Sequence, residues 1–256
     1  MRPISLNPVV LFLRACLYFL GTATTILFFS PLSLLLVVLM VPYQLRFRII
    51  SRWGHFNIWW LKISCGVGYR VEGLENIPRD SAAIIYVKHE STWETYAMQK
   101  FFPPHAWIMK RELLWLPFFG WGLASLNPIA IDRKSGRRAI HQITKQGTKK
   151  LHEGQWVMVF PEGTRVKNGS MKRFGIGGAL LAEKSGYPII PVAHNAGAFW
   201  PRGGFIKTPG TIQIVIGEPI LTQGKNHNEI NAEAEAWMQS TMERINGRPT
   251  EILARK

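Results

Sequence analysis

The sequence predicts an α/β protein, in which a largely parallel sheet is flanked by helices and preceded by an apolar helical segment. Residues 66–256 alternate between short apolar runs and stretches with helical spacing, which is typical of a parallel sheet with helices packed on it. Most apolar runs show no alternation in polarity, as expected of strands buried on both faces. The 31 residues between Arg14 and Arg46 carry no charge, whereas a membrane span needs only roughly 20 apolar residues.

Composition excludes two classes of protein. Of the 256 residues, 47% are hydrophobic, 18% are charged and 10 are Trp, so the chain is not intrinsically disordered. Two cysteines, Cys16 and Cys65, are too few for a disulfide scaffold. The net charge is +15, from 31 Lys and Arg against 16 Asp and Glu. A chain that is both basic and apolar indicates a partner that is itself anionic and apolar, or an anionic partner together with a membrane segment in the chain.

The N-terminal segment, residues 1–65, is expected to associate with a membrane. It contains no Asp or Glu, and its apolar run continues past Pro31 to Val41, longer than the roughly 7–15 residues of a signal peptide's apolar region. One geometry is a single tilted span. The other is a helical hairpin broken at Ser30-Pro31, because proline removes a helical N–H donor. Basic flanks on both sides favour the hairpin, with both ends cytoplasmic.

Residues 66–256 are expected to form one α/β domain with a single core, since about 190 residues suffice to bury one. The expected strands are the runs at 69–72, 82–87, 107–109, 128–131, 156–160, 189–193 and 211–216. The expected helices are at 92–101, 137–153, 178–185 and 229–245. The last helix begins with acidic residues and has Arg244 near its end, an order that suits the helix dipole.

The first candidate site lies where the strand at 82–87 gives way to a helix, a position where sites form in α/β folds. His89 falls in the turn and Glu94 in the first turn of the helix. The imidazole can act as a general base, and the carboxylate can hold its tautomer and stabilise the imidazolium. Ser91 and Glu94 also match a capping box, in which Glu94 only caps the helix. Both roles remain open for Glu94 on the sequence alone.

Three further motifs accompany apolar strands. Residues 160–165 read Phe-Pro-Glu-Gly-Thr-Arg, where the glycine allows close backbone approach and the planar guanidinium of Arg165 suits a phosphate. Residues 131–133 read Ile-Asp-Arg, and residues 190–192 read Ile-Pro-Val. Lys110 follows another strand and precedes a loop rich in Trp, Pro and Phe.

Together these motifs resemble those of the glycerolipid acyltransferases that acylate lysophosphatidic acid, the 1-acylglycerol-3-phosphate acyltransferases. The family's His-x4-Asp motif corresponds to residues 89–94, and its Phe-Pro-Glu-Gly-Thr-Arg motif to residues 160–165 without change. Its Ile-Asp-Arg-like and apolar-Pro-apolar motifs correspond to residues 131–133 and 190–192. Order and spacing agree over residues 66–220.

Glu94 departs from the family pattern, in which this acid is usually Asp. Glutamate has one more methylene, so a small shift of the turn keeps its carboxylate within reach of His89. A divergent branch with a different acceptor is the other explanation. Because the acid is retained, we expect activity to survive.

The resemblance implies an enzyme that moves a fatty acyl group from acyl-CoA or acyl carrier protein to the sn-2 hydroxyl of lysophosphatidic acid, making phosphatidic acid. His89 would take the hydroxyl proton, and Glu94 would orient the imidazole and balance its charge. The residues expected around the acceptor phosphate are Lys110, Arg133, Glu162, Gly163, Thr164 and Arg165. Neither a cofactor, a metal nor a covalent acyl-enzyme is expected, since no Gly-x-Ser-x-Gly elbow and no paired Cys/His spacing is present.

The remaining basic residues indicate a membrane surface. Residues 133–184 hold twelve Lys and Arg against three acids. Each cation near an anionic lipid surface contributes roughly 1 kcal/mol to binding, so anionic membrane lipids are the expected partner; a docking patch for acyl carrier protein is the alternative. Nucleic acid is not an expected partner, because the tryptophans do not interleave with the cations. The resemblance places the catalytic domain on the cytoplasmic face of a bacterial-type inner membrane.

Two alternative functions stay open. One is acylation of another lysolipid by a member of the same family, such as a lyso-ornithine lipid or lysophosphatidylglycerol. The other is a membrane lipid-binding protein that kept the fold and lost the chemistry. The presence of His89 and of the unchanged motif at residues 160–165 argues against the second alternative.

Overall fold

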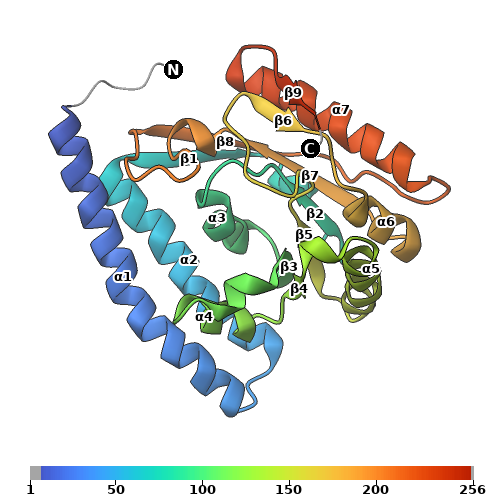
Figure 1. Ribbon diagram of the computed structural model, residues 1–256, viewed down its shortest axis with the longest axis horizontal. Coiled ribbons are helices and arrows are strands. Elements are labelled where there is room, and N and C mark those ends of the chain that lie inside the picture. Colours follow the sequence, from blue (N-terminus) through green and yellow to red (C-terminus); the bar gives the residue numbers. More distant parts are fainter. Residues whose placement is uncertain (1–6, 255–256) are drawn as a thin grey trace.

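A seven-stranded sheet organises the described part of the chain, residues 7–254 of the computed structural model (Figure 1). Its strands run in the order β1-β8-β7-β2-β5-β3-β4. The strand bounds are β1 Val67–Glu72, β2 Ile84–Val87, β3 His105–Lys110, β4 Ile129–Ile131, β5 Trp156–Val159, β7 Ile189–His194 and β8 Gly210–Ile216. Every neighbouring pair is parallel except β7 with β8. The largely parallel sheet is therefore confirmed, and all seven expected strands are present.

Helices cover the sheet in two layers. The helix bounds are α1 Pro8–Val38, α2 Tyr43–Cys65, α3 Trp93–Phe101, α4 Phe119–Ser125, α5 Arg137–His152, α6 Ile176–Ser185 and α7 His227–Asn246. α3 connects β2 to β3, whereas α5 and α6 belong to crossovers that traverse the sheet in the opposite direction. Because such crossovers are right-handed, α3 lies on one face and α5 with α6 on the other. α2 contacts α3 in the first layer, and α7 contacts α6 in the second.

The central strands are apolar runs because no side of them faces water. Every residue of β2, β5 and β7 is buried, as expected when helices cover both faces of a sheet.

Two elements of the structure were not predicted from the sequence. The chain forms a small parallel pair from β6, Ser170–Lys172, and β9, Glu251–Leu253. It also forms the short helix α4 within a region expected to be a loop.

The N-terminal segment forms a helical hairpin, but the expected break at Ser30-Pro31 is wrong. α1 continues through Pro31, and the chain reverses at residues 39–42 before α2. An internal proline costs a helix about 3 kcal/mol, and here the packing of α1 against α4 holds the helix together. The Ser30 hydroxyl donates a hydrogen bond of 2.5 Å to the carbonyl of Phe118, the residue just before α4.

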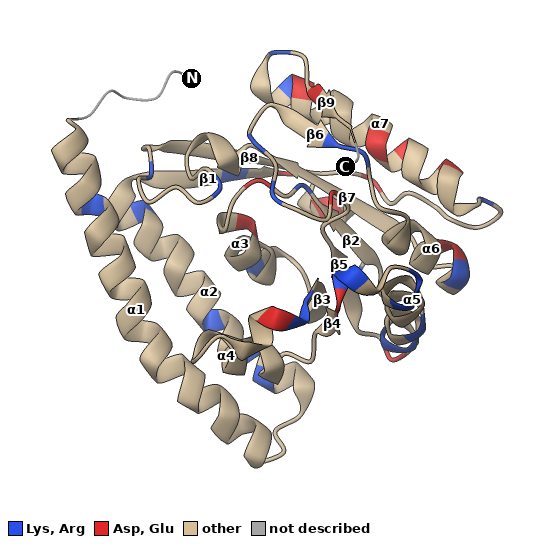
Figure 2. Ribbon diagram, viewed as in Figure 1, with Lys and Arg blue, Asp and Glu red and all other residues tan. Residues whose placement is uncertain are grey.

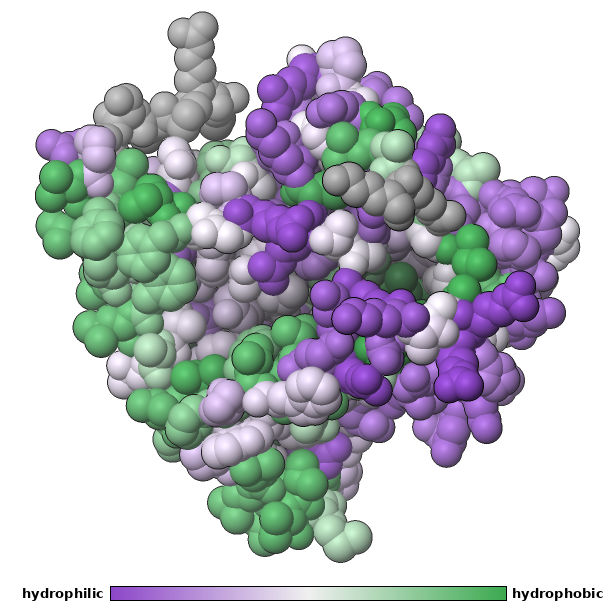
Figure 3. Space-filling model, viewed as in Figure 1, coloured by the Kyte–Doolittle hydropathy of each residue, from purple (hydrophilic) through white to green (hydrophobic). Residues whose placement is uncertain are grey.

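The apolar surface of α1 indicates membrane association. Arg14 is the one charged residue along this helix, whereas α5 and its surroundings carry many Lys and Arg (Figure 2). Its 31 residues span about 47 Å, against roughly 30 Å of bilayer hydrocarbon. Among the described helices, α1 is the one long and apolar enough to cross a membrane. Apolar side chains cover its outer surface, seen as a green band in Figure 3.

Two tryptophans of α2 hold the hairpin together through hydrogen bonds. The indole N–H of Trp53 donates to the Thr25 hydroxyl at 3.0 Å, and that of Trp60 donates to the Leu17 carbonyl at 3.2 Å. Trp59 is instead 54% exposed. Of the three, Trp59 is therefore the one free to contact the membrane–water interface, where tryptophan is favoured.

A buried lysine joins α1 to the loop before β8. Lys207 is 1% exposed, and its ammonium nitrogen lies over four aromatic rings at distances between 3.6 and 5.4 Å. These rings belong to Tyr18, Phe19, Trp200 and Phe205. Its ammonium also donates a hydrogen bond to the Phe205 carbonyl, and no ion pair joins it to an acid within residues 7–254. Burial lowers the pKa of Lys207 to about 8.

We predict that the buried charge of Lys207 destabilises the chain at neutral pH. Its pKa is about 8 in the folded state, below its ordinary value of 10.5, so the unfolded state binds more protons between these values and the wild type gains stability as pH rises. The variant Lys207→Met has a similar shape and no such proton. We therefore expect the Tm of the variant minus that of the wild type to fall between about pH 7 and about pH 10. Circular dichroism in detergent measures it, and a difference that grows with pH contradicts the prediction.

Candidate active site

Parallel strands that end at one edge of the sheet bring the sequence motifs together. β2, β5, β3, β4 and β7 run in the same direction, so their carboxyl ends lie side by side. His89 follows β2, the motif at residues 160–165 follows β5, and Lys110 ends β3. β2 and β5 are neighbours, with Tyr86 opposite Val159. His89 and the motif at residues 160–165 therefore lie next to each other. This edge is where ligands bind in open α/β sheets.

His89 and Glu94 form a hydrogen-bonded pair. His89 Nδ1 lies 2.8 Å from Glu94 Oε1, and the imidazole stacks on Phe160 with ring centres 3.9 Å apart. The His89 side chain is 12% exposed, whereas that of Glu94 is fully buried. Because a carboxylate can only accept, Nδ1 carries the proton and donates it. The lone pair of His89 Nε2 is thereby left to accept a proton from another molecule.

Glu94 also caps helix α3. Its Oε1 accepts the backbone N–H groups of Glu90 and Ser91 at 3.1 and 2.9 Å, just before α3 begins at Trp93. The two roles that the sequence leaves open, cap and partner of His89, therefore coexist in one carboxylate. Burial by itself raises the pKa of Glu94, but the hydrogen bonds from His89 and Ser91 outweigh it and hold the pKa below its ordinary value. A negative charge is thus kept beside the imidazole.

Glu162 does not fit the expected contact with an acceptor phosphate. Its Oε1 accepts hydrogen bonds from Lys88 Nζ at 2.8 Å and from the Lys172 N–H at 3.2 Å, and its Oε2 accepts the His89 N–H at 2.9 Å. Both oxygens are occupied, and a carboxylate repels phosphate. Glu162 instead fixes the backbone of His89. The fully buried ammonium of Lys88 supplies the counter-charge.

A second histidine, His194, lies behind Glu94; the sequence marks it only as a minor candidate, because it follows the strand that carries the Ile-Pro-Val motif. His194, at the end of β7, donates from Nε2 to the Lys88 carbonyl at 2.8 Å and accepts the Ala196 N–H at Nδ1. Its Nε2 is 3.9 Å from Glu94 Oε2. Burial lowers its pKa, which suits the neutral tautomer that these bonds require. Within residues 7–254, no three His, Cys, Asp or Glu are grouped as a metal site requires.

The other predicted residues lie at strand ends and turns along the same edge of the sheet. Arg133 donates a hydrogen bond to the Gly163 carbonyl, which joins the turns after β4 and β5. Gly163 has a φ of +68°, a conformation that favours glycine in a tight turn. Thr164 and Arg165 line an open cavity, and Arg165 also reaches a separate apolar pocket. Lys110 is exposed at the end of β3.

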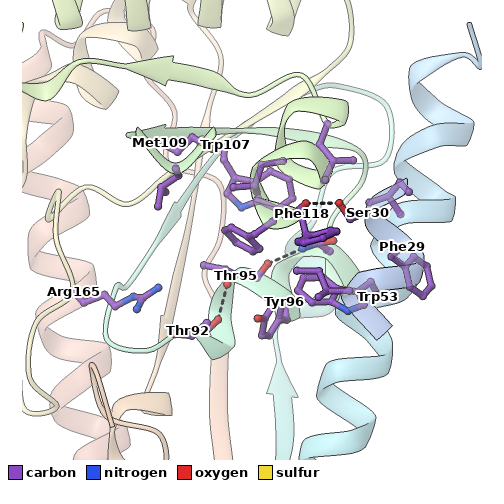
Figure 4. A pocket seen from close by; sticks show the side chains of 18 residues that line it. Phe29, Ser30, Trp53, Thr92, Thr95, Tyr96, Trp107, Met109, Phe118 and Arg165 are labelled. Carbon is purple, nitrogen blue, oxygen red and sulfur yellow. Dashed lines mark hydrogen bonds between the residues drawn. The ribbon is translucent and has the colours of Figure 1, made fainter. Parts of the chain in front are cut away.

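The apolar pocket encloses about 160 Å³ between the hairpin and the helices α3 and α4 (Figure 4). Its walls include Phe29 from α1, Trp53 from α2, Trp107 from β3 and Phe118 before α4. Arg165 is the one charged residue among those that line it, and it lies at one end (Figure 4). Phe118 has a φ of +61°, which is strained for a residue with a side chain. The pocket was not predicted, because its walls come from elements far apart in the sequence.

Comparisons with known proteins relate this geometry to a family. The family model described as Acyltransferase matches residues 68–195. A 1-acyl-sn-glycerol-3-phosphate acyltransferase from Pseudomonas aeruginosa is 44% identical over 237 residues, 91% of each chain. The human 1-acyl-sn-glycerol-3-phosphate acyltransferase alpha is 30% identical, covering 84% of this chain and 78% of its own. The crystal structure of the 1-acyl-sn-glycerophosphate (LPA) acyltransferase from Thermotoga maritima matches with a TM-score of 0.77 and 26% identity, over 93% of this chain and 97% of that chain.

We predict that the Lys88–Glu162 pair stabilises the site as a unit. Removing one partner of a buried ion pair leaves an uncompensated charge and costs about 3–5 kcal/mol, so Lys88→Met alone should destabilise the chain strongly. In the double variant Lys88→Met with Glu162→Gln, the orphaned charge is gone, so its cost should be at least about 1 kcal/mol below the sum of the single variants. Urea unfolding in detergent gives the three free energies. Strictly additive costs would show that the two groups do not interact.

Proposed function

This chain belongs to the acyltransferase family, and we propose that it moves a fatty acyl group from a thioester to the sn-2 hydroxyl of 1-acyl-sn-glycerol 3-phosphate, making phosphatidic acid. The observation that carries the proposal is the His89–Glu94 pair, in which Nδ1 donates to the carboxylate and Nε2 is left to accept a proton. The pair lies against the motif turn, since the imidazole stacks on Phe160 and the His89 carbonyl accepts the Val166 N–H. The names of the relatives from Pseudomonas aeruginosa and human support the acceptor.

Proton transfer at His89 is the chemical step that these residues perform. Nε2 takes the proton of the sn-2 hydroxyl while the hydroxyl oxygen attacks the thioester carbonyl carbon. The C–S bond then breaks, and the departing thiolate takes the proton back from Nε2. Glu94 stabilises the intervening imidazolium and, through its bonds to Glu90 and Ser91, holds the turn in place. Glu162 positions His89 by accepting its backbone N–H.

The lysolipid is held by charge at one end and by apolar contact at the other. Arg165, which lines both cavities, and Lys110, which is exposed at the end of β3, would bind the acceptor phosphate. Arg133 restrains the adjacent turn through Gly163. The apolar pocket beside Arg165 would take a fatty chain, because its other lining residues are uncharged. Burial of each methylene there contributes about 0.8 kcal/mol to binding.

The membrane supplies the lipid substrate. α1 presents the apolar surface, and the cations around α5 would attract anionic lipid headgroups. We place the chain at a bacterial-type inner membrane with the site on the cytoplasmic face, where acyl-CoA and acyl carrier protein are both candidate donors. No cofactor enters the reaction as proposed.

Substitution of the pair tests the role of each group. General base catalysis contributes about 10²–10⁴-fold, so His89→Ala should lose at least about a hundredfold in kcat with lysophosphatidic acid and acyl-CoA. Glu94→Gln keeps an oxygen that can cap α3 and loses the negative charge, so it should remain folded and lose a comparable factor. Glu94→Asp, which keeps the charge, should retain more activity than Glu94→Gln.

Thiol release from acyl-CoA measures these rates, and circular dichroism serves as the folding control. Full turnover by His89→Ala would overturn the catalytic proposal. Full turnover by Glu94→Gln would mean that Glu94 acts on the reaction only through the helix cap.

The apolar pocket should set the length of the fatty chain that is accepted. Gly122 of α4 lines the pocket, and a Cβ added there meets no atom within 4 Å. Gly122→Phe should fill that space and reduce turnover of long-chain substrates by about tenfold or more relative to short-chain ones, a discrimination that pockets achieve with few methylenes. Gly122→Ala is the matched control and should keep the wild-type profile. An unchanged chain-length profile in Gly122→Phe, for acceptor and donor alike, contradicts this assignment.

A further inference from the structure

Glu90 is a buried acid that the proposed reaction does not use. It follows His89 directly, its side chain is fully buried, and its N–H donates to Glu94 Oε1 at 3.1 Å. Its Oε2 accepts the Gly197 N–H at 3.0 Å, so Glu90 joins the turn after β2 to the turn after β7. Its Oε1 has no hydrogen-bond partner among the described residues. The charge state of Glu90 therefore matters for the His89–Glu94 pair beside it, because salt screens a buried charge poorly.

Three carboxylates share one ammonium in this part of the site. Lys88 Nζ lies 2.8 Å from Glu162 Oε1 and 3.7 Å from Glu90 Oε1, and all three side chains are fully buried. The third carboxylate, that of Glu94, receives the Nδ1–H of His89. Glu162 thus takes the hydrogen bond of the ammonium, and Glu90 lies beyond hydrogen-bond distance. A buried carboxylate without a counter-charge of its own binds a proton rather than remain ionised.

Beyond Lys88, no cation within residues 7–254 forms an ion pair with Glu90. His194, at the end of β7, is held as the neutral tautomer by its bonds to Lys88 and Ala196. Five cations line the open cavity whose wall includes Glu90, and water screens those that are exposed. They are Arg165, Lys167, Lys172, Arg202 and Arg248. The shared ammonium of Lys88 is therefore what opposes the charge of Glu90.

The surroundings of Glu90 favour the protonated acid. Burial, together with the neighbouring carboxylates, raises its pKa to about 8 against the opposing effect of Lys88. Asn168 Oδ1 is a second buried oxygen without a hydrogen-bond donor in the described part of the chain. The two side chains lie close together, since a Cβ built on Gly197 would meet Glu90 Oε2 at 2.8 Å and Asn168 Cβ at 3.4 Å. A protonated Glu90 brings an O–H donor to this place, whereas an ionised one adds only a further acceptor.

We propose that Glu90 is a positioning residue that works as a neutral acid: it leaves the Lys88 ammonium to Glu162, and Glu162 thereby holds the backbone of His89 in place. This inference rests on the proposed function, because its consequence is a rate of acyl transfer. Glu162 accepts the His89 N–H through Oε2 at 2.9 Å while its Oε1 binds Lys88. Anything that draws the ammonium away from Glu162 therefore acts on His89 through this one carboxylate.

Ionisation of Glu90 would draw on the same ammonium. Lys88 Nζ is already 3.7 Å from Glu90 Oε1, so a small movement brings it to hydrogen-bond distance at the expense of its bond to Glu162. Two buried carboxylates would then share one ammonium, and one negative charge would remain uncompensated. We expect the turn that carries His89 to loosen and the rate to fall as the pH rises through about 8.

The variant Glu90→Gln has the shape of the neutral acid and cannot ionise. Its amide oxygen can accept the Gly197 N–H, and its NH₂ group replaces the O–H donor, so the link to the turn after β7 is kept. The test compares kcat/KM of wild type and variant between about pH 6.5 and about pH 9.5, with acyl-CoA and lysophosphatidic acid. At about pH 9 only about a tenth of the wild type keeps the Glu90 proton, so the ratio of variant to wild type should rise by about threefold or more from its value at about pH 7.

Two features of this comparison isolate Glu90. Lys207, whose pKa is also about 8, is present in both proteins, so its titration cancels in the ratio. Glu153→Gln removes an exposed acid just after α5, outside the site, and is the matched control, whose ratio to wild type should stay constant with pH. A constant ratio for Glu90→Gln overturns the proposal. A ratio that falls with pH also overturns it, because the ionised acid would then assist His89.

Thermal stability tests the neutral acid without any turnover. The pKa of Glu90 is about 8 in the folded state, above its ordinary value of 4.5, so the folded state binds more protons between these values and the wild type loses stability as pH rises. The Tm of Glu90→Gln minus that of the wild type should therefore rise between about pH 5 and about pH 8, as measured by circular dichroism in detergent. A difference that is flat or falls over this range contradicts the neutral acid.

Infrared spectra of the wild type give the same answer without relying on a variant. At about pH 7 ordinary acids are ionised, so the band of a protonated carboxyl should be present and should disappear above about pH 9. Absence of this band at neutral pH overturns the proposal even if the enzyme turns over normally. A band and a rising Tm difference in a chain that shows no acyl transfer would instead overturn the proposed function and leave the neutral acid standing.

Discussion

The buried ion pair between Lys88 and Glu162 is the interaction on which the site depends. It joins the end of β2 to the turn after β5, two positions that are adjacent only because those strands pair in the middle of the sheet. Through its other oxygen, Glu162 accepts the backbone N–H of His89, and Glu94 accepts the Nδ1 proton. Two carboxylates thus fix the imidazole from two directions, one by its backbone and one by its ring. Such an arrangement requires burial of three charged groups, which is tolerated because each is paired or hydrogen-bonded.

Features determined by short-range pattern could be predicted from the sequence, and those determined by packing could not. The buried strands could be predicted because strands covered by helices on both faces are apolar throughout. The pairing of His89 with Glu94 could be proposed because one lies in a turn and the other in the first turn of the next helix, only five residues later. The role of Glu162 could not be predicted, because its partner Lys88 lies 74 residues away in the sequence and meets it only through the pairing of β2 with β5. Pro31 looked like a helix break because the support of α1 by α4 comes from a segment about 90 residues later in the chain.

The positive charges fall into groups with different physical situations. Lys88 is fully buried and neutralises carboxylates, and Lys207 is enclosed by aromatic rings. Of the cations that line the open cavity, Lys167, Arg202 and Arg248 are exposed, as are most of those of α5. The net charge of +15 therefore does not describe a uniformly basic surface. Lys88 neutralises buried carboxylates, Lys207 contacts both α1 and the loop before β8, and the exposed cations attract anions. The attraction of anions depends most on ionic strength, because exposed charges are screened by salt and buried ones much less.

The hydrogen bond from Ser30 to the Phe118 carbonyl links the lipid-facing helix to a strained residue in the wall of the apolar pocket. The tilt of a long apolar helix in a bilayer is set by its packing on neighbouring elements, here α2 and α4, and hydrophobic mismatch adds a fraction of a kcal/mol per ångström. Because α1 also contributes Phe29 to the pocket, a change in its tilt moves one wall relative to the others. One wall of the apolar pocket is therefore part of the helix that is long and apolar enough to cross a membrane, so the position of this helix and the shape of the pocket are coupled.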